Sequence, residues 1–464
     1  MWLLCAAGYP AATGTVTLRR LPQTESSSLM LSTLRNPTFR HLFAAQIVAL
    51  VGTGLATVAL GLLAWHLAGD TAGAVLGTAL AIKMVAYVTL APIAAAIAER
   101  LPRRAFLVAL DLIRALVIGA LPFVDQIWQV YVLIFLLQAA SAGFTPAFQA
   151  VIPDVIKDEG DYTNALSLLR LAEDLEQVAS PVLAAALLTV VGFPVLFAGT
   201  VVGFIGSALL VATARLPGRV KSSPGSFRED VTKGLRIYVA TPRLRGLMAM
   251  EGAVAAAGAM VYVNTVVLVQ DRLGLGEQQV ALAFAAFGAG SMVAAFLLPR
   301  MLTRVADRPL MIGGAALMVA GVAAVPLAAT FVGLMALWAV IGFGFAVTQT
   351  PIGRIINRSA RDEDRGAVFA AQFALSHACW LVTYPLAGWI GADFGIPAAA
   401  LTLAAVGASG LLATLRLWPG HDPVIVRHDH PDLPTDHPHL RDHGPDHAHP
   451  LVIDDLHRRW PKLA

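Results

Sequence analysis

Long apolar runs, repeated along most of the chain, limit what this sequence can fold into. A helix needs about 20 mostly apolar residues to cross a bilayer. Twelve such runs are present, and short stretches with charged residues, Gly or Pro separate them. They lie at about residues 42–67, 73–98, 105–123, 128–150, 166–191, 194–213, 247–269, 278–299, 309–329, 331–352, 366–390 and 394–415. The sequence therefore predicts an all-α membrane protein with twelve transmembrane helices.

The composition excludes several other classes of protein. Charged residues make up 14% of the 464 residues and hydrophobic residues 57%, whereas a soluble domain of this size carries about 25% charged residues. No GxxxxGK[ST] loop is present, so the chain carries no ATPase motif of its own. The two cysteines, Cys5 and Cys379, form no zinc-type CxxC pattern. No catalytic triad emerges either, and we expect no enzyme activity.

Lys and Arg are distributed very unevenly between the two sides of the predicted membrane domain. Of the 33 basic residues, 30 lie in the termini, in alternate loops or, for Arg170, at the start of the adjoining span, and only Arg272 lies in a loop of the opposite side. Lys83 and Arg114 lie within spans. Basic loops stay on the cytoplasmic side, so we expect a multi-pass protein of a bacterial-type inner membrane with both termini in the cytoplasm.

The two halves of the chain repeat each other. Thr145-Pro146 recurs as Thr350-Pro351 and Arg103 recurs as Arg308, both after 205 residues. Such repeats are typical of secondary transporters, which bind substrate between the repeats near the bilayer midplane. We expect a disordered N-terminal extension at 1–37 (with Met30 as a plausible start), six-helix bundles at 38–213 and 247–415, a cytoplasmic loop at 214–246 and a tail at 416–464.

The loop after the second span carries a motif. It reads Ala95-Ala96-Ile97-Ala98-Glu99-Arg100-Leu101-Pro102-Arg103-Arg104. This resembles the G-x-x-x-D-R-x-G-R-R/K signature of the major facilitator superfamily, although Ala, Glu and Pro replace Gly, Asp and Gly. The resemblance implies two pseudo-symmetric six-helix bundles that alternate access to a central cavity. It also implies a monomer that carries a small molecule or a metal ion and uses protons as the coupling ion. The motif implies a gating role for Glu99, Arg100, Arg103, Arg104 and the repeated Arg308.

A second resemblance concerns the branch of the family. The segments Phe144-Thr145-Pro146-Ala147 and Ile152-Pro153-Asp154 resemble exporters related to enterobactin exporters and nickel-resistance proteins. The Gly-Pro antiporter motif of the fifth helix is only half present, as Ser180-Pro181. The resemblance therefore implies export, whereas this half motif does not by itself indicate drug–proton antiport.

Charged residues inside the spans are candidate functional groups, because burying charge in a bilayer is costly. Lys83 lies ten residues into the second span, about 15 Å deep. It either lines the cavity, pairs with Asp111 or reaches toward the membrane surface. Asp111 and Arg114 share a helix face and are expected to form a local ion pair. Glu251 is either a proton-coupling acid or a partner in a cytoplasmic gate.

Polar and aromatic side chains within the spans complete the predicted cavity. His377 and Trp380 lie one turn apart on the eleventh span. His377 either carries a proton or a metal, or it only connects helices. Five amides lie near the middle of spans and either line the cavity or join helices by hydrogen bonds: Gln46, Gln138, Asn264, Gln349 and Gln372.

Nine of the twelve histidines lie in the tail between His421 and His457. Six of them form three H-x-H pairs: His428 and His430, His437 and His439, and His447 and His449. Imidazole suits Ni, Co and Zn, so we expect the pairs to bind a divalent metal, although the tail is alternatively a plain solvated segment. The many prolines predict a disordered tail without metal.

Two substrates follow from these patterns. The tail favours a divalent transition metal such as nickel or cobalt, whereas the apolar, glutamine-containing cavity favours a hydrophobic organic compound or a siderophore. In both cases the chain is predicted to be a secondary active exporter driven by the proton-motive force. A membrane metal sensor that transports nothing is the alternative.

Overall fold

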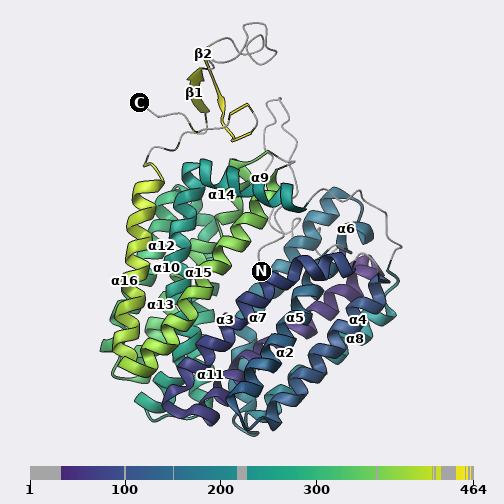
Figure 1. Cartoon of the computed structure of the whole chain (residues 1–464), viewed down its shortest axis with the longest axis vertical. Coiled ribbons are helices and arrows are strands. Elements are labelled where there is room, and N and C mark those ends of the chain that lie inside the picture. Colours follow the sequence, from purple (N-terminus) through teal and green to yellow (C-terminus); the bar gives the residue numbers. More distant parts are fainter. Residues whose placement is uncertain are drawn as a thin grey trace.

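A computed structural model describes residues 33–98, 101–149, 151–216, 227–361, 364–420, 422, 425–429, 446–454, 456, 457 and 460. Figure 1 shows two helical bundles that lie side by side. We call residues 33–216 the N half and residues 227–417 the C half. Two short strands lie beyond the C half, above α14 in this view (Figure 1).

The helices of the N half follow one another with short connections. They are η1 Thr33–Arg35, α2 Pro37–Ala68, η2 Gly69–Thr71, α3 Ala72–Ala98, α4 Arg103–Ala120, η3 Leu121–Phe123, α5 Ile127–Gln149, α6 Ile152–Val155, α7 Glu159–Leu187 and α8 Pro194–Thr213.

The C half has one additional helix at its start. Its elements are α9 Phe227–Ala240, α10 Pro242–Val267, η4 Leu268–Arg272, α11 Glu277–Leu302, α12 Asp307–Ala324, η5 Val325–Leu327, α13 Phe331–Gln349, α14 Ile352–Ser359, α15 Arg365–Phe394 and α16 Ile396–Leu417. The strands are β1 Ile425–Asp429 and β2 Asp446–Pro450.

Local sequence signals fix where several helices begin. The side chain of Asn36 accepts hydrogen bonds from the amides of Thr38 and Phe39, and Pro37 occupies the first turn of α2. Asp158 caps α7 by accepting a hydrogen bond from the amide of Asp161. Both arrangements satisfy backbone donors that a helix start leaves unpaired.

The predicted helical membrane fold is confirmed. Among the described residues, ten stretches are long and apolar enough to cross a membrane, and one of them, Pro37–Leu90, contains both α2 and most of α3. The predicted span at 166–191 corresponds to α7, which carries several acidic residues and is not among the ten. The count of twelve therefore stays a prediction.

The packing of the helices repeats between the halves. In the N half α2 packs on α8 and α3 packs on α5; in the C half α10 packs on α16 and α11 packs on α13. Between the halves, α3 packs on α15 and α11 packs on α7. The repeat seen in the sequence therefore extends to the helix contacts.

Glycines bring the halves into close contact at one end. A Cβ on Gly77 would lie 2.4 Å from the carbonyl oxygen of Tyr384, and one on Gly388 would lie 2.2 Å from that of Gly73. Only glycine permits this approach between α3 and α15. These contacts lie away from α9, α14 and the strands, whose side of the molecule we call the tail end.

The halves diverge toward the tail end. On α11, Val280, Phe284 and Phe287 are buried near the opposite end, whereas Val293, Phe296 and Leu297 are 51%, 72% and 42% exposed nearer the tail end. α11 also packs on α7, and Figure 1 shows the ribbons of the two halves farther apart toward the tail end.

The segments expected from the sequence contain some regular structure. Helix α9 and the start of α10 lie within the expected loop 214–246, and β1 and β2 lie within the tail. Residues 1–32 of the expected N-terminal extension lie outside the described residues.

Candidate functional site

Lys83 of α3 and Glu176 of α7 face the interface from the N half. The charge of Glu176 acts on Lys83, and both side chains are half-buried. A Cβ on Gly54 would lie 2.2 Å from a carboxylate oxygen of Glu176 and from Cβ of Ser180. The absence of a side chain at Gly54 therefore lets Glu176 pack directly against α2.

Asp111 is engaged elsewhere. It forms the predicted ion pair with Arg114, and its other oxygen accepts a hydrogen bond of 2.8 Å from Ser207. The Arg114 guanidinium lies 3.9 Å from the ring centre of Phe144, within cation–π range. This buried group joins helices of the N half, and Lys83 is left with Glu176 as the acid that acts on it.

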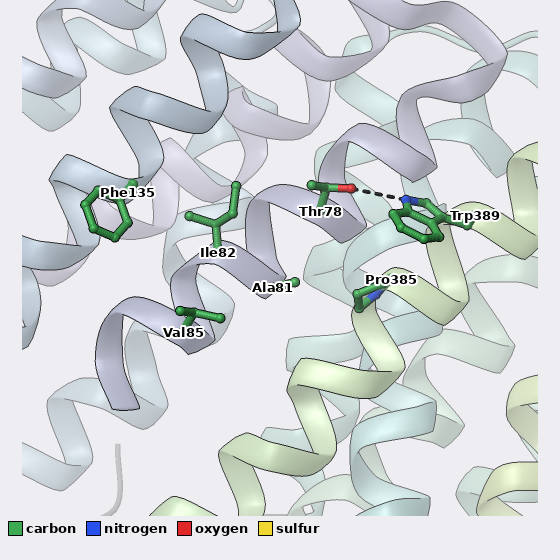
Figure 2. A pocket seen from close by; sticks show the side chains of 7 residues that line it. All are labelled: Thr78, Ala81, Ile82, Val85, Phe135, Pro385 and Trp389. Carbon is green, nitrogen blue, oxygen red and sulfur yellow. Dashed lines mark hydrogen bonds between the residues drawn. The ribbon is translucent and has the colours of Figure 1, made fainter. Parts of the chain in front are cut away.

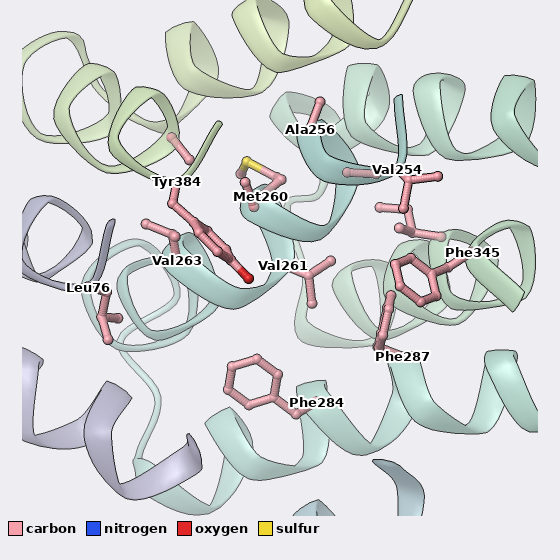
Figure 3. Packing of buried hydrophobic residues seen from close by; sticks show 14 of the residues in the cluster. Leu76, Val254, Ala256, Met260, Val261, Val263, Phe284, Phe287, Phe345 and Tyr384 are labelled. Atoms are coloured by element: carbon pink, nitrogen blue, oxygen red, sulfur yellow. The ribbon is translucent and has the colours of Figure 1, made fainter. Parts of the chain in front are cut away.

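The C half faces the interface with aromatic rings. Tyr262 of α10 lies 5.9 Å from Phe287 and 6.2 Å from Trp380, and Trp380 lies 5.0 Å from Tyr384, all between ring centroids. Figure 3 shows Phe284 and Phe287 of α11 on one side of α10 and Tyr384 on the other. Glu176 lies on α7, the helix of the N half that packs on α11, which carries Phe284 and Phe287 of this wall.

His377 connects the two halves. Its ring lies 6.2 Å from that of Tyr87 on α3, in a stacked arrangement, and 3.8 Å from that of Phe373. Nδ1 of His377 lies 2.8 Å from the carbonyl oxygen of Phe373. We define the central site by six half-buried residues: Lys83, Tyr87, Glu176, Tyr262, His377 and Trp380.

Glu251 lies in a separate polar group inside the C half. It is 1% exposed, and it accepts hydrogen bonds of 3.3 Å from Gln349 Nε2 and 2.7 Å from Gln372 Nε2. Gln372 in turn accepts a hydrogen bond from the hydroxyl of Tyr238 on α9. Three predicted cavity residues therefore join α10, α13 and α15, and they do not line the central site.

The remaining predicted amides are divided between the halves. Asn264 is fully buried at the end opposite the tail and donates a hydrogen bond of 3.1 Å to the carbonyl oxygen of Ala387. Gln46 on α2 and Gln138 on α5 are half-buried. Asn264 therefore stabilises the C half beside the close contact between the halves.

The predicted gating residues lie at the tail end. Arg103 forms an ion pair with Asp154, and Arg104 Nη2 donates a hydrogen bond of 2.7 Å to the carbonyl oxygen of Ala214. Arg308 Nε donates to the carbonyl oxygen of Trp418 at 3.0 Å. Glu99 and Arg100 lie outside the described residues.

The tail histidines are described only in part. In the antiparallel pair of β1 and β2, His428 lies opposite His447 and Val426 opposite His449. Residues His430, His437 and His439 lie outside the described residues. Among the side chains that the structure describes, no three His, Cys, Asp or Glu gather closely enough to hold a metal ion.

A groove of about 340 Å³ opens beside the interface of the halves. Figure 2 shows its seven lining residues: Thr78, Ala81, Ile82, Val85, Phe135, Pro385 and Trp389. The lining is apolar, and its two polar side chains bind each other through Trp389 Nε1 and Thr78 Oγ1 at 3.2 Å. Trp389 is 56% exposed, so the groove lies on the outer surface and is distinct from the central site.

Sequence reasoning missed Glu176 and the tyrosines. Glu176 lies ten residues into the predicted span 166–191, as deep as Lys83, so the cost of burying charge would have identified it. Tyr87, Tyr262 and Tyr238 carry no such signal, because an aromatic residue in an apolar span is most often part of the core.

The arrangement of residues and helices matches a known family. The family model "Major Facilitator Superfamily" matches residues 42–276 and 248–438. The chain belongs to the major facilitator superfamily, whose members are membrane-embedded transporters of small molecules rather than enzymes.

Curated relatives suggest the branch. The chain is 25% identical over 208 residues to macrolide efflux protein A of Streptococcus pyogenes, which covers 43% of this chain and 50% of that protein. It is 24% identical over 175 residues to macrolide efflux protein A of Enterococcus faecalis, covering 35% of this chain and 54% of that protein. The chain thus matches about half the length of these relatives, a similarity consistent with the predicted exporter branch.

Solved structures share the fold at low identity. The nucleoside transporter NupG (D323A mutant) superimposes with a TM-score of 0.66 at 12% identity, over 82% of this chain and 100% of that one. A bacterial homologue of the human lysosomal transporter Spinster, inward-facing and occupied, gives 0.61 at 15% identity over 82% and 93%. The D-xylose–proton symporter gives 0.58 at 16% identity over 85% and 97%.

Proposed function

We propose that this chain is a proton-driven exporter of small amphiphilic organic molecules that works by alternating access. The observation that carries the proposal is the central site, where the charges of Lys83 and Glu176 face an aromatic wall from the other half. Aromatic rings bind apolar or cationic ligands, and a few polar groups orient them. The macrolide efflux relatives support export of an organic compound.

Proton coupling is assigned to Glu176. A carboxylate in a bilayer interior is costly, and it is less so when it is protonated or paired. Glu176 is half-buried and its charge acts on Lys83 without a direct ion pair, so Glu176 is free to take up and release a proton as the substrate enters. The proposed cycle binds substrate from the tail end and releases it after that end has closed.

The orientation in the membrane follows from the basic residues. The uneven distribution of Lys and Arg supports an inner-membrane location with both termini in the cytoplasm, which makes the tail end the cytoplasmic end. A reporter fused after Ala464 that is active only in the cytoplasm would support this orientation. Activity only in the periplasm would contradict it.

The direct test is transport by the purified chain in proteoliposomes. We expect an outward-directed flux of an organic cation such as ethidium, or of a macrolide such as erythromycin, when a proton gradient is imposed. The matched control is the same protein with the gradient collapsed by an ionophore. Equal flux with and without the gradient would contradict proton coupling, and no flux of any probe would contradict the organic substrate.

A divalent metal is the second candidate substrate. The register of the hairpin supports it, because His428 pairs with His447 and His449 follows two residues later in β2. A tail that collects Ni²⁺, Co²⁺ or Zn²⁺ would serve either metal export or metal sensing. Uptake of radioactive nickel by the same vesicles distinguishes export from sensing.

A further inference from the structure

The N half closes its tail end with its own residues. Arg103, after the second span, forms an ion pair with Asp154, in the connection between α5 and α7. Arg104 reaches the carbonyl oxygen of Ala214 at the end of α8. Within the N half, Asp154 is therefore the acid that pairs with the motif arginine Arg103.

The repeat lacks this acid in the C half. Arg308 matches Arg103 after 205 residues, and it reaches the carbonyl oxygen of Trp418, which matches Ala214 after 204 residues. The residue that matches Asp154, again after 205 residues, is Ser359. A serine cannot supply a negative charge, so the matching position of the C half has no acid of its own.

The tail supplies an acid, Asp422, next to Ser359. Asp422 Oδ1 lies 3.1 Å from Arg243 Nη1 at the start of α10, and Oδ2 lies 2.5 Å from Arg358 Nη2 on α14. Arg243 is 3% exposed and also donates a hydrogen bond of 2.8 Å to Ser359 Oγ. A buried guanidinium without an acidic partner is strongly destabilising, so Asp422 stabilises this corner of the C half.

A second attachment lies beyond the hairpin. Asp454 forms an ion pair with Arg361, and the ring of Trp460 lies 4.9 Å from the Arg243 guanidinium. Burial raises the pKa of Asp454, but hydrogen bonds from His457 and the charge of Arg361 outweigh it, so the pKa lies below its usual range. The attachment is therefore present at neutral pH and is lost only as the pH falls below the usual range of a carboxyl.

We propose that the tail is an intramolecular clamp for the tail end of the C half, in which Asp422 supplies a negative charge to Arg243 and Arg358 beside Ser359, the position that matches Asp154. By joining α10 to α14 it holds the C half as one body during the transport cycle. Asp422 is thus a positioning residue, and its removal slows turnover without weakening substrate binding. The effect on turnover rests on the proposed transport function, whereas the clamp itself does not.

Hydrogen exchange of the full-length protein tests the clamp directly. Asp422→Asn removes the negative charge that faces both arginines and replaces one of the two acceptor oxygens by an NH2 donor, so amide exchange in α14 and in the first two turns of α10 is expected to rise about 10- to 100-fold. Asp429→Asn is the matched control, because Asp429 is an exposed acid of the same tail. Exchange in the N half stays unchanged in both variants.

Further variants keep the test decisive. Arg358→Gln, whose side chain is partly exposed, is expected to raise exchange in the same two segments. The double variant with Asp422→Asn should be no worse than Asp422→Asn alone, and Asp422→Glu should restore much of the protection. If Asp422→Asn does not fold, Arg358→Gln decides the result.

Transport separates the two parts of the inference. In vesicles that export ethidium, Asp422→Asn should lower kcat several-fold with KM within twofold of the wild type. Unchanged exchange in α14 and α10, or an equal rise in Asp429→Asn, would overturn the clamp. Raised exchange with normal kcat would overturn its part in the cycle. Wild-type vesicles that export no probe would overturn the proposed function and leave the exchange result standing.

Discussion

The two halves share one arrangement of helices but differ in the chemistry of their interiors. The N half contains charges, with Lys83 near Glu176 and Asp111 bound to Arg114. The C half contains a carboxylate held by two neutral amides, beside a wall of aromatic rings. In the C half, a tail acid pairs with Arg243 and Arg358, whereas in the N half Asp154 pairs with Arg103 within the half.

The difference between the halves shows that the helix contacts of a repeat are constrained by packing, whereas the charged side chains are free to differ. The contacts of α2 with α8 and of α10 with α16 are equivalent, because both bundles must bury the same kind of apolar face. Burying an apolar face does not require charged groups at the interface, so these groups need not be the same in the two halves. We infer that the N half exchanges charge during transport while the C half provides a neutral surface for the substrate.

The largest effect is expected from removing the charges of the N half. Glu176→Gln and Lys83→Met should each lower proton-driven export at least ~10- to 100-fold, because each removes one of the two opposite charges that act on each other at the interface. Expression and the amount of folded protein should remain close to wild type, since both side chains are half-buried and face the interface. Flux in vesicles under an imposed proton gradient measures the loss.

The matched control lies in the buried ion pair of the same half. Asp111→Asn should lower thermal stability more than either central-site variant does, because it leaves Arg114 buried without its acid. Normal proton-driven export by Lys83→Met would show that Lys83 only stabilises the fold. The proposed coupling site would then be wrong.

A smaller effect is expected from Glu251. Glu251→Gln should reduce two fluxes by the same factor, roughly tenfold: export driven by a proton gradient, and exchange of substrate across the membrane without a proton gradient. The reason is that Glu251 joins α10, α13 and α15 rather than carrying the proton. The two flux assays, run on the same vesicles, provide the comparison. Loss of proton-driven export with normal exchange in the absence of a proton gradient would instead identify Glu251 as the coupling acid.

Most of the fold could be predicted from the sequence, because crossing a bilayer demands long apolar helices whose ends and repeats are visible in one chain. Lys83 was identified by the same reasoning, since its depth can be counted along the span. The grouping of Glu251 with Gln349 and Gln372 could not be predicted, because it depends on three helices far apart in the sequence. The contact of Asp422 with Arg243 depends on the path of the tail and carries no local signal.

The gating arginines provide a third comparison. Arg103→Ala removes an ion pair, whereas Arg308→Ala removes a hydrogen bond to a backbone carbonyl. We therefore expect Arg103→Ala to lower kcat about fivefold and Arg308→Ala about twofold, with KM within a few-fold of wild type in both. Initial rates over a range of ethidium concentrations measure the two constants. A large rise in KM with normal kcat would show that these residues bind substrate.

The smallest effect on transport is expected from the tail histidines, although their effect on metal binding should be clear. The register of the hairpin pairs His428 with His447. A pair that the backbone already positions loses less conformational entropy when it binds a metal. Changing His428 and His447 to Ala should therefore weaken Ni²⁺ binding about tenfold, and the change of His437 and His439 to Ala provides the comparison.

Calorimetric titration of the full-length protein with Ni²⁺ at pH 7.5 measures this difference. Neutral imidazole is the ligand, so binding should weaken as the pH falls below about 6. Ethidium export by both variants should stay within twofold of wild type, because neither change touches Asp422 or the central site. Equal loss of affinity in the two variants would show that the hairpin gives no advantage. No detectable heat in the wild type would remove the support for a metal as substrate and leave the organic compound as the proposal.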